Sequence, residues 1–569
     1  MKLILTDYIA SLKEDGELDA LLMELLRALD VEVVFGPKKG ERQYGVDIYA
    51  VGTDWEDGIR KLFLVTVKQG NFDRKNWHGT PQSIQPSLYE MATTFVRNNI
   101  APEHKGLPVK IVVAHNGAND PAVQQDWTAF VEQFPQLQFV LWQLETIVRL
   151  VEEHLLDENL FSDKAKRVLR KIIIHLADPS YDLADVAFII DEIIAQIDLG
   201  GAGRRKNLNN LRKINLLLNI ILSYCEFEND LRLALKATEM TVLRMWDLFR
   251  NYLDNFDEGY WTEFARTLHL KRDVGLKYLK KVSDACDVRD GFSKYCRDTV
   301  TYSFTVYENL GFLAIPGLEF IQMAESYISE EREVAARLEE QAAYFADAIV
   351  GIYNNNPICF SPRADNQINE INFVFLLLYR LGRIGDIRAL LYQYNEQLAL
   401  GALYAKIAPH FHNNHDNIYE LDIQYEKRKE FNYESSCLLA VLVEWCVVIG
   451  DKGMYEAYTQ LKTMIFSKTD LILWFPDEAT EGLLYREYAT KKTGYSLSGI
   501  ELVGYEEFAQ LTLTEYVHNC AEVSFSFMNQ RVWIIGLIAS RHFGTYVFPH
   551  YWRQLIKNHS AFVTETIPA

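Results

Sequence analysis

Hydrophobic and polar residues alternate in different rhythms in the two parts of the chain. Before about residue 157, residues 17–29 carry leucines at helical spacing, whereas residues 46–51 and 62–68 follow the two-residue rhythm of strands. Polar and Gly-containing segments separate these stretches, as turns do. The first part therefore has the predicted order helix, three strands, helix, strand, helix, strand, helix. The other predicted strands cover 31–35, 109–115 and 137–142, and the other predicted helices cover 83–97, 122–134 and 143–156.

From about residue 157 onward the pattern is helical. Residues 369–398 and 436–466 each contain two helical stretches joined by a turn with Gly and Asp. The turns Ile384-Gly385-Asp386 and Ile449-Gly450-Asp451 lie 65 residues apart (449 − 384 = 65). Paired helices with short turns resemble helical-repeat arrays of the tetratricopeptide type, whose concave surfaces bind partners. An irregular helical bundle without a binding groove is the alternative.

These two patterns define the expected fold class and domain boundaries. We predict a multidomain protein in which an α/β domain precedes a large all-α region built as a helical repeat or a bundle. The predicted domains are residues 1–157, residues 158–355 as a helical linker or assembly domain, and residues 356–569 as a helical-repeat-like sensing or partner-binding domain.

Composition restricts the classes of function. The net charge of −20 argues against a protein that coats nucleic acid through bulk charge, so a nucleic-acid site has to be a local basic patch. The seven cysteines form no Cys-x-x-Cys pair, which favours reduced thiols over a cysteine-based zinc site. The first residues lack a signal-peptide pattern, and the most apolar runs, 437–450 and 532–540, are too short to span a bilayer. We therefore expect a cytoplasmic protein without a membrane partner.

Two charged residues occupy adjacent strands of the predicted hairpin. Asp47 lies on the first strand, and Lys68 lies near the end of the second, 21 residues later (68 − 47 = 21). An ionised lysine at the end of an otherwise apolar strand needs a reason, because buried charges are normally paired or bind a metal. Asp47 on the neighbouring strand supplies one.

The residues around this pair resemble a known nuclease motif. Gly45-Val46-Asp47 followed by Thr66-Val67-Lys68 is similar to the Gly-Val-Asp and (Glu/Gln)-x-Lys strands of the restriction-endonuclease-like PD-(D/E)xK superfamily. The similarity is to its Mrr-type branch of bacterial restriction and anti-phage proteins, and it covers roughly the first 155 residues. It implies an αβββαβ core, which the first six predicted elements match. It also implies a Mg²⁺- or Mn²⁺-dependent endonuclease acting on nucleic acid, with double-stranded DNA as the favoured substrate.

The resemblance assigns roles to individual residues. Asp47 would be the main metal ligand, helped by the backbone carbonyl of Val67 and by Glu24 on the first predicted helix. Lys68 would hold the scissile phosphate or the attacking water and stabilise the developing charge. Gln85, in the helix after the strands, is the kind of polar residue that the family places near the lysine. A solvated helical glutamate is the alternative reading of Glu24.

Basic and aromatic side chains flank both strands of the motif. Cations can hold phosphates while an aromatic ring stacks on a base or fills a groove. The alternative for the second flank is a solvent-exposed loop with its tryptophan packed beneath it. The candidates for nucleic-acid binding are Lys38, Lys39 and Arg42 before the first strand, and Arg74, Lys75 and Trp77 after the second.

Thr66 departs from the resembled motif, because the family has an acidic residue or glutamine at that position. A hydroxyl is a poorer metal ligand than a carboxylate, so we expect lower metal affinity unless Glu24 or Asp73 compensates. Two further hypotheses follow. The chain could be a catalytically degenerate nuclease that binds nucleic acid or a partner without cutting. It could also be an interaction protein whose helical region is the working part, with Asp47 and Lys68 as a plain buried ion pair.

Two other segments carry candidate chemistry. Residues 199–203 are rich in glycine but lack the spacing of a phosphate loop, so a turn before a basic helix is favoured. Three histidines and an aspartate within 410–416 could hold zinc, although a polar loop is favoured. The cations that would extend a nucleic-acid track are Arg204, Arg205, Lys206, Arg212 and Lys213.

Together these features predict a metal-dependent endonuclease domain followed by a helical control region. The resemblance to Mrr-type proteins suggests an effector of bacterial anti-phage defence. A toxic nuclease has to be restrained, and the helical region is the expected control element. A homo-oligomer or a companion defence subunit is the expected protein partner.

Overall fold

The computed structural model divides the chain into two compact units. The first contains residues 1–229 and 258–263, and the second contains residues 230–257 and 264–569. The three-domain division made from sequence stays a prediction. The structure describes residues 2–37, 43–80, 83–155, 167–169, 171–172, 175, 181, 183–201, 203–253, 257–327, 331–405, 409–410, 418, 433–486, 494–520 and 523–556.

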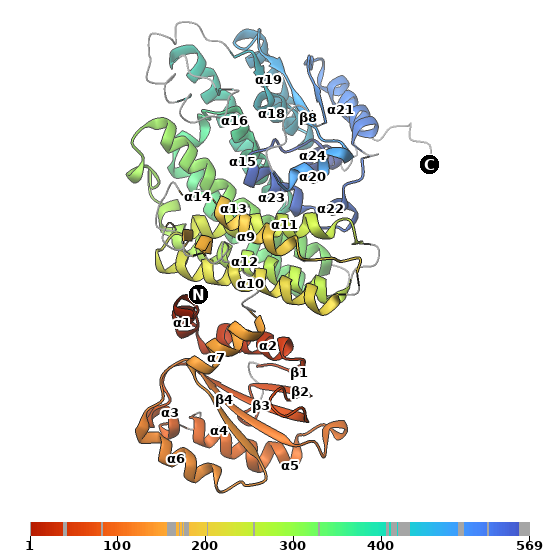
Figure 1. The fold of residues 1–569 in the computed structure, drawn as a ribbon. Helices are drawn as coiled ribbons and strands as arrows, with labels where there is room; N and C mark the ends of the chain where they lie inside the picture. The colour runs from red at the N-terminus through yellow and green to blue at the C-terminus, as the bar shows by residue number, and fades with distance from the viewer. Residues whose placement is uncertain are drawn as a thin grey trace. The chain divides into compact units, whose positions relative to one another are not determined.

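The first unit is built on a mixed sheet of five strands in the order β1-β2-β3-β4-β5 (Figure 1). The first three strands pair antiparallel, and β3, β4 and β5 pair parallel. A short hairpin joins β2 to β3, whereas helical crossovers join the parallel strands, as their direction requires. The strands are β1 (Val31–Phe35), β2 (Ile48–Thr53), β3 (Arg60–Lys68), β4 (Val109–His115) and β5 (Gln138–Trp142).

Helices cover both faces of this sheet (Figure 1). One face carries α1 (Lys2–Ser11), α2 (Asp19–Ala28) and α7 (Leu144–Leu150), with the π-helical turns η1 (Glu14–Leu18) and η4 (Val151–Leu155). The other face carries α3 (Arg74–His78), α4 (Ile84–Glu90), η2 (Met91–Phe95), α5 (Val96–Asn98) and α6 (Pro121–Val131). An α/β domain at the start of the chain, followed by a helical region, was predicted correctly.

The alternation of the strands explains the core on the second face. Side chains two residues apart on β3 and β4 point the same way. They pack against apolar side chains of α3, α4 and α6, including Trp77, Leu88 and Trp127. The same rhythm continues to the end of β3, so Thr66 and Lys68 follow Leu62 and Leu64 on one side of the strand. The buried strand therefore delivers two polar groups to the edge of the sheet.

The rest of the chain is mostly helical, but it is not free of strands. Four strands of two or three residues form two small sheets, β6 (Ser435–Ser436) with β7 (Asp470–Leu471) and β8 (Leu473–Phe475) with β9 (Tyr495–Leu497). Strands this short contain too few residues to show an alternation of hydrophobic and polar positions in the sequence. The principal helices are α9 (Ala184–Ile194), α10 (Arg204–Phe227), α11 (Leu231–Phe249), α12 (Glu258–Cys286), α13 (Thr299–Tyr327), α14 (Arg332–Asn355), α15 (Ile368–Arg380), α16 (Ile384–Leu400), α18 (Cys437–Val448), α19 (Lys452–Met464), α21 (Tyr505–Asn519), α23 (Ile534–Phe543) and α24 (His550–Ile556).

Two helical hairpins, α15–α16 and α18–α19, repeat in the second unit. Each first helix ends at a left-handed glycine, Gly382 with φ 71° and Gly450 with φ 69°. In both turns the next N–H, from Arg383 or Asp451, donates to a carbonyl five residues earlier. The equivalent glycines are thus Gly382 and Gly450, and the sequence pairing of Gly385 with Gly450 was wrong. Gly385 instead lies in the first turn of α16.

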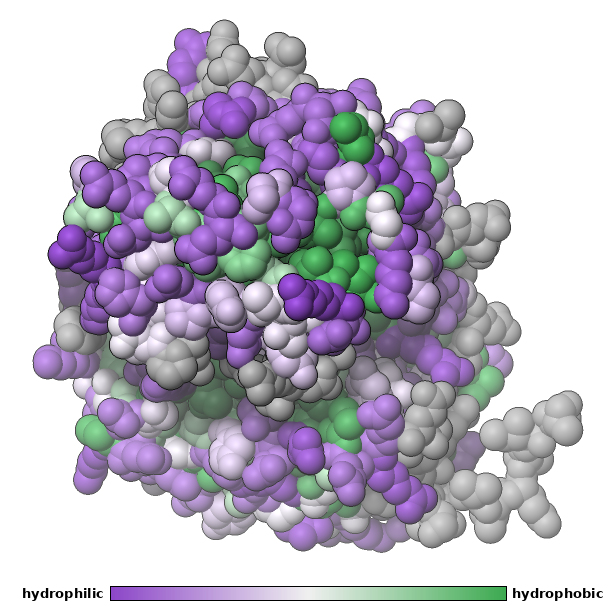
Figure 2. Space-filling view, turned by 90° about the horizontal axis from the view of Figure 1, so that it is seen from below, coloured by the Kyte–Doolittle hydropathy of each residue, from purple (hydrophilic) through white to green (hydrophobic). Residues whose placement is uncertain are grey.

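Hydrophilic side chains cover most of the face drawn in Figure 2, with smaller hydrophobic patches between them. Scattered exposed hydrophobic residues are normal on protein surfaces. Within the described ranges, no helix combines the length and the apolar character needed to cross a bilayer.

Candidate active site

A tight turn before β2 sets the position of Asp47. Tyr44 and Gly45 both have positive φ, 52° and 80°, and the Val46 N–H donates to the Gln43 carbonyl at 3.1 Å. A Cβ on Gly45 would lie 2.5 Å from the backbone oxygen of Ser87 in α4. The glycine is therefore required both by the left-handed conformation and by the close approach of the helix.

The Asp47 carboxylate is held against the end of β3. Its Oδ2 accepts hydrogen bonds from the Val67 N–H at 2.7 Å and from the Thr66 hydroxyl at 3.2 Å. In the described part of the chain, its Oδ1 accepts no hydrogen bond. Burial raises the pKa of Asp47, and the Val67 N–H, Lys68 and Thr66 only partly oppose that rise. The carboxylate is therefore held by its Oδ2, has an Oδ1 without a hydrogen-bonding partner among the described residues, and is not fully stabilised in its ionised form by the groups around it.

Lys68 meets a carboxylate that the sequence interpretation did not select. Its Nζ lies 2.8 Å from Oε1 of Glu14, and the Gln69 N–H donates to Oε2 of the same side chain at 3.2 Å. Glu14 begins η1, where Asp15 is extended and Gly16 has φ 81°, so the helical path breaks between α1 and α2. This kink places Glu14 at the end of β3.

Glu24, the predicted helical acid, lies in a different environment. Its carboxylate binds Arg27 within α2 and the Nε of Arg212 in α10 at 3.4 Å. The structure therefore brings Glu14, Asp47, Thr66 and Lys68 together at the edge of the sheet and pairs Glu24 with arginines. Glu14 was missed because it precedes the predicted helix of residues 17–29, in a stretch without a helical or strand pattern of its own. The Gly16 break was the one available signal.

Thr66 has a clear structural task. Its side chain is buried, and its hydroxyl donates to Asp47. In this geometry Thr66 orients the carboxylate beside it.

Asp73, considered as a substitute ligand, is the N-cap of α3 and accepts a hydrogen bond from the Asn76 N–H at 2.9 Å. Its carboxylate is therefore used by the helix end.

The predicted nucleic-acid contacts divide into three groups. Lys38, Lys39 and Arg42 lie outside the described residues. Arg74 and Lys75 are exposed on α3, and Gln85 is half-buried in the first turn of α4.

Trp77 was assigned wrongly to nucleic-acid binding. It is 1% exposed, and its ring packs at centroid distances of 5.6 Å from Phe72 and 6.2 Å from Trp127. A side chain enclosed in this way belongs to the core and cannot stack on a base. The alternative reading, a tryptophan packed beneath an exposed loop, is correct.

The five cations between Arg204 and Lys213, predicted to extend a nucleic-acid track, are largely engaged within the fold. Arg212 pairs with Glu24 and Glu263, and Lys213 is buried beside Asn210. Arg205 binds Asp30. These pairings leave no continuous track through the five cations. Of the proposed zinc segment, residues 411–416 lie outside the described residues.

The donor set can be tested against a divalent cation. Among the described residues, no cluster of three or more His, Cys, Asp or Glu side chains is arranged to hold a metal. Mg²⁺ needs less, because it is held by one or two carboxylates together with waters and substrate phosphate. Asp47, with its spare oxygen, and Glu14 provide these two carboxylates. The residues thus fit Mg²⁺ or Mn²⁺ and lack the nitrogen and sulfur ligands of a zinc site.

No family model, curated protein or solved structure matches the chain.

Proposed function

We propose that the first unit is a Mg²⁺- or Mn²⁺-dependent endonuclease domain that cleaves phosphodiester bonds, with double-stranded DNA as the favoured substrate. The observation that supports this proposal most directly is the meeting of Glu14, Asp47 and Lys68 where β2 begins and β3 ends. One or two carboxylates can hold the Mg²⁺ that activates a phosphodiester, and a lysine beside them can stabilise the charge that develops on the phosphate.

In this proposal Asp47 and Glu14 hold the cation, and the backbone carbonyl of Val67 stays a candidate third ligand. A bound Mg²⁺ supplies Lewis-acid polarisation of the phosphate and lowers the pKa of a coordinated water. Thr66 and the Val67 N–H hold Oδ2 of Asp47, and its Oδ1, which accepts no hydrogen bond within the described residues, would be the oxygen available to the cation. The chain thereby provides a carboxylate that needs no reorganisation when substrate binds.

Lys68 serves the substrate in the same scheme. In the absence of substrate its ammonium group is paired with Glu14. A phosphate at the site would offer Lys68 a second anionic partner, and Glu14 would then be free to serve as a ligand of the cation. Lys68 then holds the scissile phosphate and stabilises the negative charge that develops on it. Arg74 and Lys75, which follow Lys68 closely in the sequence and are exposed on α3, contact phosphates of the nucleic-acid backbone.

A second candidate function is a degenerate nuclease fold that binds nucleic acid or a protein without cutting. The observation that favours it is that both acids already have partners within the fold, since Thr66 and the Val67 N–H donate to Asp47 and Lys68 donates to Glu14. Thr66 also adds no carboxylate. A site of this kind would be a structural ion-pair cluster.

Cleavage assays separate the two functions. Purified full-length protein is incubated with supercoiled plasmid, linear DNA or RNA in Mg²⁺ or Mn²⁺, beside Lys68→Ala and an EDTA control. The endonuclease predicts nicked or linear products that need both the metal and Lys68. The degenerate fold predicts salt-sensitive binding without products.

We further propose a cytoplasmic effector of anti-phage defence, restrained by the helical region through self-association or a companion subunit. This role rests on the resemblance to Mrr-type proteins. Bacteria expressing the wild type or Lys68→Ala at equal levels are challenged with a panel of phages. The proposal predicts a drop in plating efficiency that Lys68→Ala abolishes. Equal plating on both strains for every phage would contradict it.

A further inference from the structure

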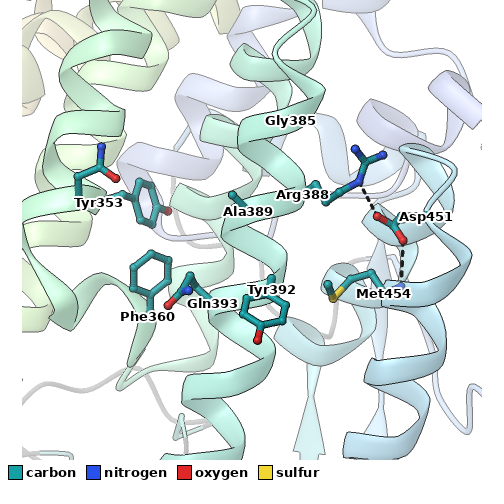
Figure 3. Close-up of a pocket in the computed structure, with 10 residues that line it drawn as sticks. Tyr353, Phe360, Gly385, Arg388, Ala389, Tyr392, Gln393, Asp451 and Met454 are labelled. Carbon is teal, nitrogen blue, oxygen red and sulfur yellow. Dashed lines mark hydrogen bonds and ion pairs between the residues drawn. The ribbon is translucent and has the colours of Figure 1, made fainter.

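A cavity of about 690 Å³ opens between α14, α16 and α19 in the second unit (Figure 3). Its volume lies within the roughly 300–1,000 Å³ of small-molecule sites. Helices α16 and α19 are the second helices of the two repeated hairpins, so the cavity lies between equivalent elements of the repeat. The repeat noticed in the sequence therefore builds one concave site.

Aromatic side chains form the base and one wall of the cavity. Tyr353 is buried and donates or accepts a hydrogen bond with Tyr394 at 2.9 Å, and the ring of Phe360 lies 5.4 Å from each of them. Tyr392, from α16, is 55% exposed at the cavity. A fixed aromatic base with one accessible ring offers a stacking surface for a planar ligand.

Two amides at the same cavity are not used by the fold. Asn354 and Gln393 line it, and among the described residues neither side chain has a hydrogen-bonding partner. Figure 3 shows Gln393 beside Phe360, on α16, the helix that also carries Tyr392. Carboxamides present a donor and an acceptor together, which matches the edge of a nucleobase.

One cation completes the lining. The Nε of Arg388 donates to Oδ2 of Asp451 at 2.6 Å, and Oδ1 of Asp451 accepts from the Met454 N–H at 3.0 Å as the N-cap of α19 (Figure 3). The guanidinium is therefore held in place by one nitrogen. Its two terminal NH₂ groups have no partner within the described residues, and this fork geometry suits a phosphate.

From these features we propose that the cavity binds a nucleotide. The base stacks on Tyr392 and is hydrogen-bonded by Asn354 and Gln393, while Arg388 binds the phosphate. An apolar ligand would make no hydrogen bonds with the two amides or the guanidinium. The combination of stacking face, amides and fixed cation therefore favours a nucleotide over a lipid or an apolar peptide. The proposal is independent of the nuclease site, which lies in the other unit.

Gly385 offers a way to close the cavity without disturbing the fold. A Cβ at this position would meet nothing within 4 Å, and the residue lies in the first turn of α16 with ordinary helical geometry. Because Gly385 lines the cavity, the side chain introduced by Gly385→Leu should occupy part of its volume. Tyr404→Ala is the matched control for Tyr392→Ala, because Tyr404 is 81% exposed and does not line the cavity.

The test is isothermal titration of the full-length chain with AMP, GMP, CMP and UMP. It is done in EDTA with Asp47→Ala in the background, so that metal-dependent binding at the first unit does not contribute. We expect at least one nucleotide to bind at one site per chain. The corresponding nucleoside and inorganic phosphate should each bind at least tenfold more weakly. Gly385→Leu, Arg388→Met and Tyr392→Ala should each weaken nucleotide binding at least tenfold, and Tyr404→Ala should leave it unchanged.

Three results would overturn the proposal. The first is the absence of binding for all four nucleotides at millimolar concentration. The second is binding that survives both Gly385→Leu and Tyr392→Ala, which would place the ligand elsewhere. The third is equal affinity for nucleoside and nucleotide, which would exclude a phosphate contact with Arg388. Unchanged circular dichroism and thermal unfolding confirm that the variants are folded.

Discussion

The ammonium group of Lys68 lies 2.8 Å from the carboxylate of Glu14, at the end of the strand that also fixes Asp47. The contact joins the kink after the first helix to the third strand of the sheet. Removing either partner leaves the other group without its neutralising charge, so the two residues are expected to act together in any activity of this site.

Glu14→Gln is expected to reduce metal-dependent cleavage at least tenfold, because it removes one of two carboxylates available to the cation. Glu24→Gln is the matched control, since that carboxylate binds arginines in a different part of the unit. Initial rates of plasmid nicking over a range of Mg²⁺ concentrations measure the effect. Equal loss of activity in both variants would show that Glu14 has no special place in the site.

Thr66→Val is expected to lower the cleavage rate several-fold. It should lower the free energy of unfolding by only about 1 kcal/mol, the usual contribution of one hydrogen bond. Valine keeps the shape of threonine but cannot donate to Asp47. Thr66→Glu, in contrast, places a second carboxylate beside the first in a buried position. We expect that variant to unfold more readily in EDTA and to recover stability in Mg²⁺. Full activity of Thr66→Val would contradict an orienting role.

Asp47→Asn is expected to stabilise the metal-free protein near pH 7. Burial raises the pKa of Asp47 in the folded chain, so the folded state binds that proton more tightly than the unfolded state does. Ionisation as the pH rises through these pKa values therefore costs stability. The cost is complete above the folded pKa and absent below the unfolded value of about 3.9.

Denaturant unfolding in EDTA at pH 7 and at low pH measures this effect. The stability difference between Asp47→Asn and the wild type should shrink as the pH falls. Mg²⁺ should stabilise the wild type more than Asp47→Asn, because ligand binding to the folded state adds stability. A wild type that gains nothing from Mg²⁺ at any concentration would favour the degenerate fold.

Trp77→Ala is expected to cost about 3–5 kcal/mol, the usual range for truncating a buried aromatic residue. The double variant Arg74→Ala, Lys75→Ala should instead leave stability almost unchanged, because both side chains are exposed. If these lysine and arginine side chains contact phosphates, the double variant should weaken DNA binding uniformly across sequences. It should also reduce the slope of log affinity against log salt by about 2. An unchanged salt slope would exclude them from the interface.

Gly382 and Gly385 test the register of the helical repeat. Gly382→Ala is expected to destabilise the chain by about 1–2 kcal/mol, because the left-handed conformation is unfavourable for alanine. Gly385→Ala is expected to stabilise it by about 0.5–1 kcal/mol, since alanine is the better helix former and has open space. Thermal unfolding of both variants measures the difference. The opposite order would support the sequence pairing of Gly385 with Gly450.

The sequence predicted the sheet well because its strands are long and their rhythm is regular. Lys68 was correctly placed at the end of a strand, whereas Asp47 was predicted on a strand and lies immediately before β2, which begins at Ile48. The choice between Glu14 and Glu24 could not be made, since it depends on a break in the helix at Gly16. The burial of Trp77 was equally hidden, because it is enclosed by α6, which lies more than forty residues later in the chain. Tertiary packing decided each of these points.

The endonuclease proposal is tested best by cleavage of supercoiled plasmid by the purified full-length chain in Mg²⁺ or Mn²⁺. Wild type and Lys68→Ala are assayed side by side, each with and without EDTA. We expect nicked or linear DNA for the wild type with metal only, and no product for Lys68→Ala. Cleavage that persists in Lys68→Ala or in EDTA would contradict the proposed site.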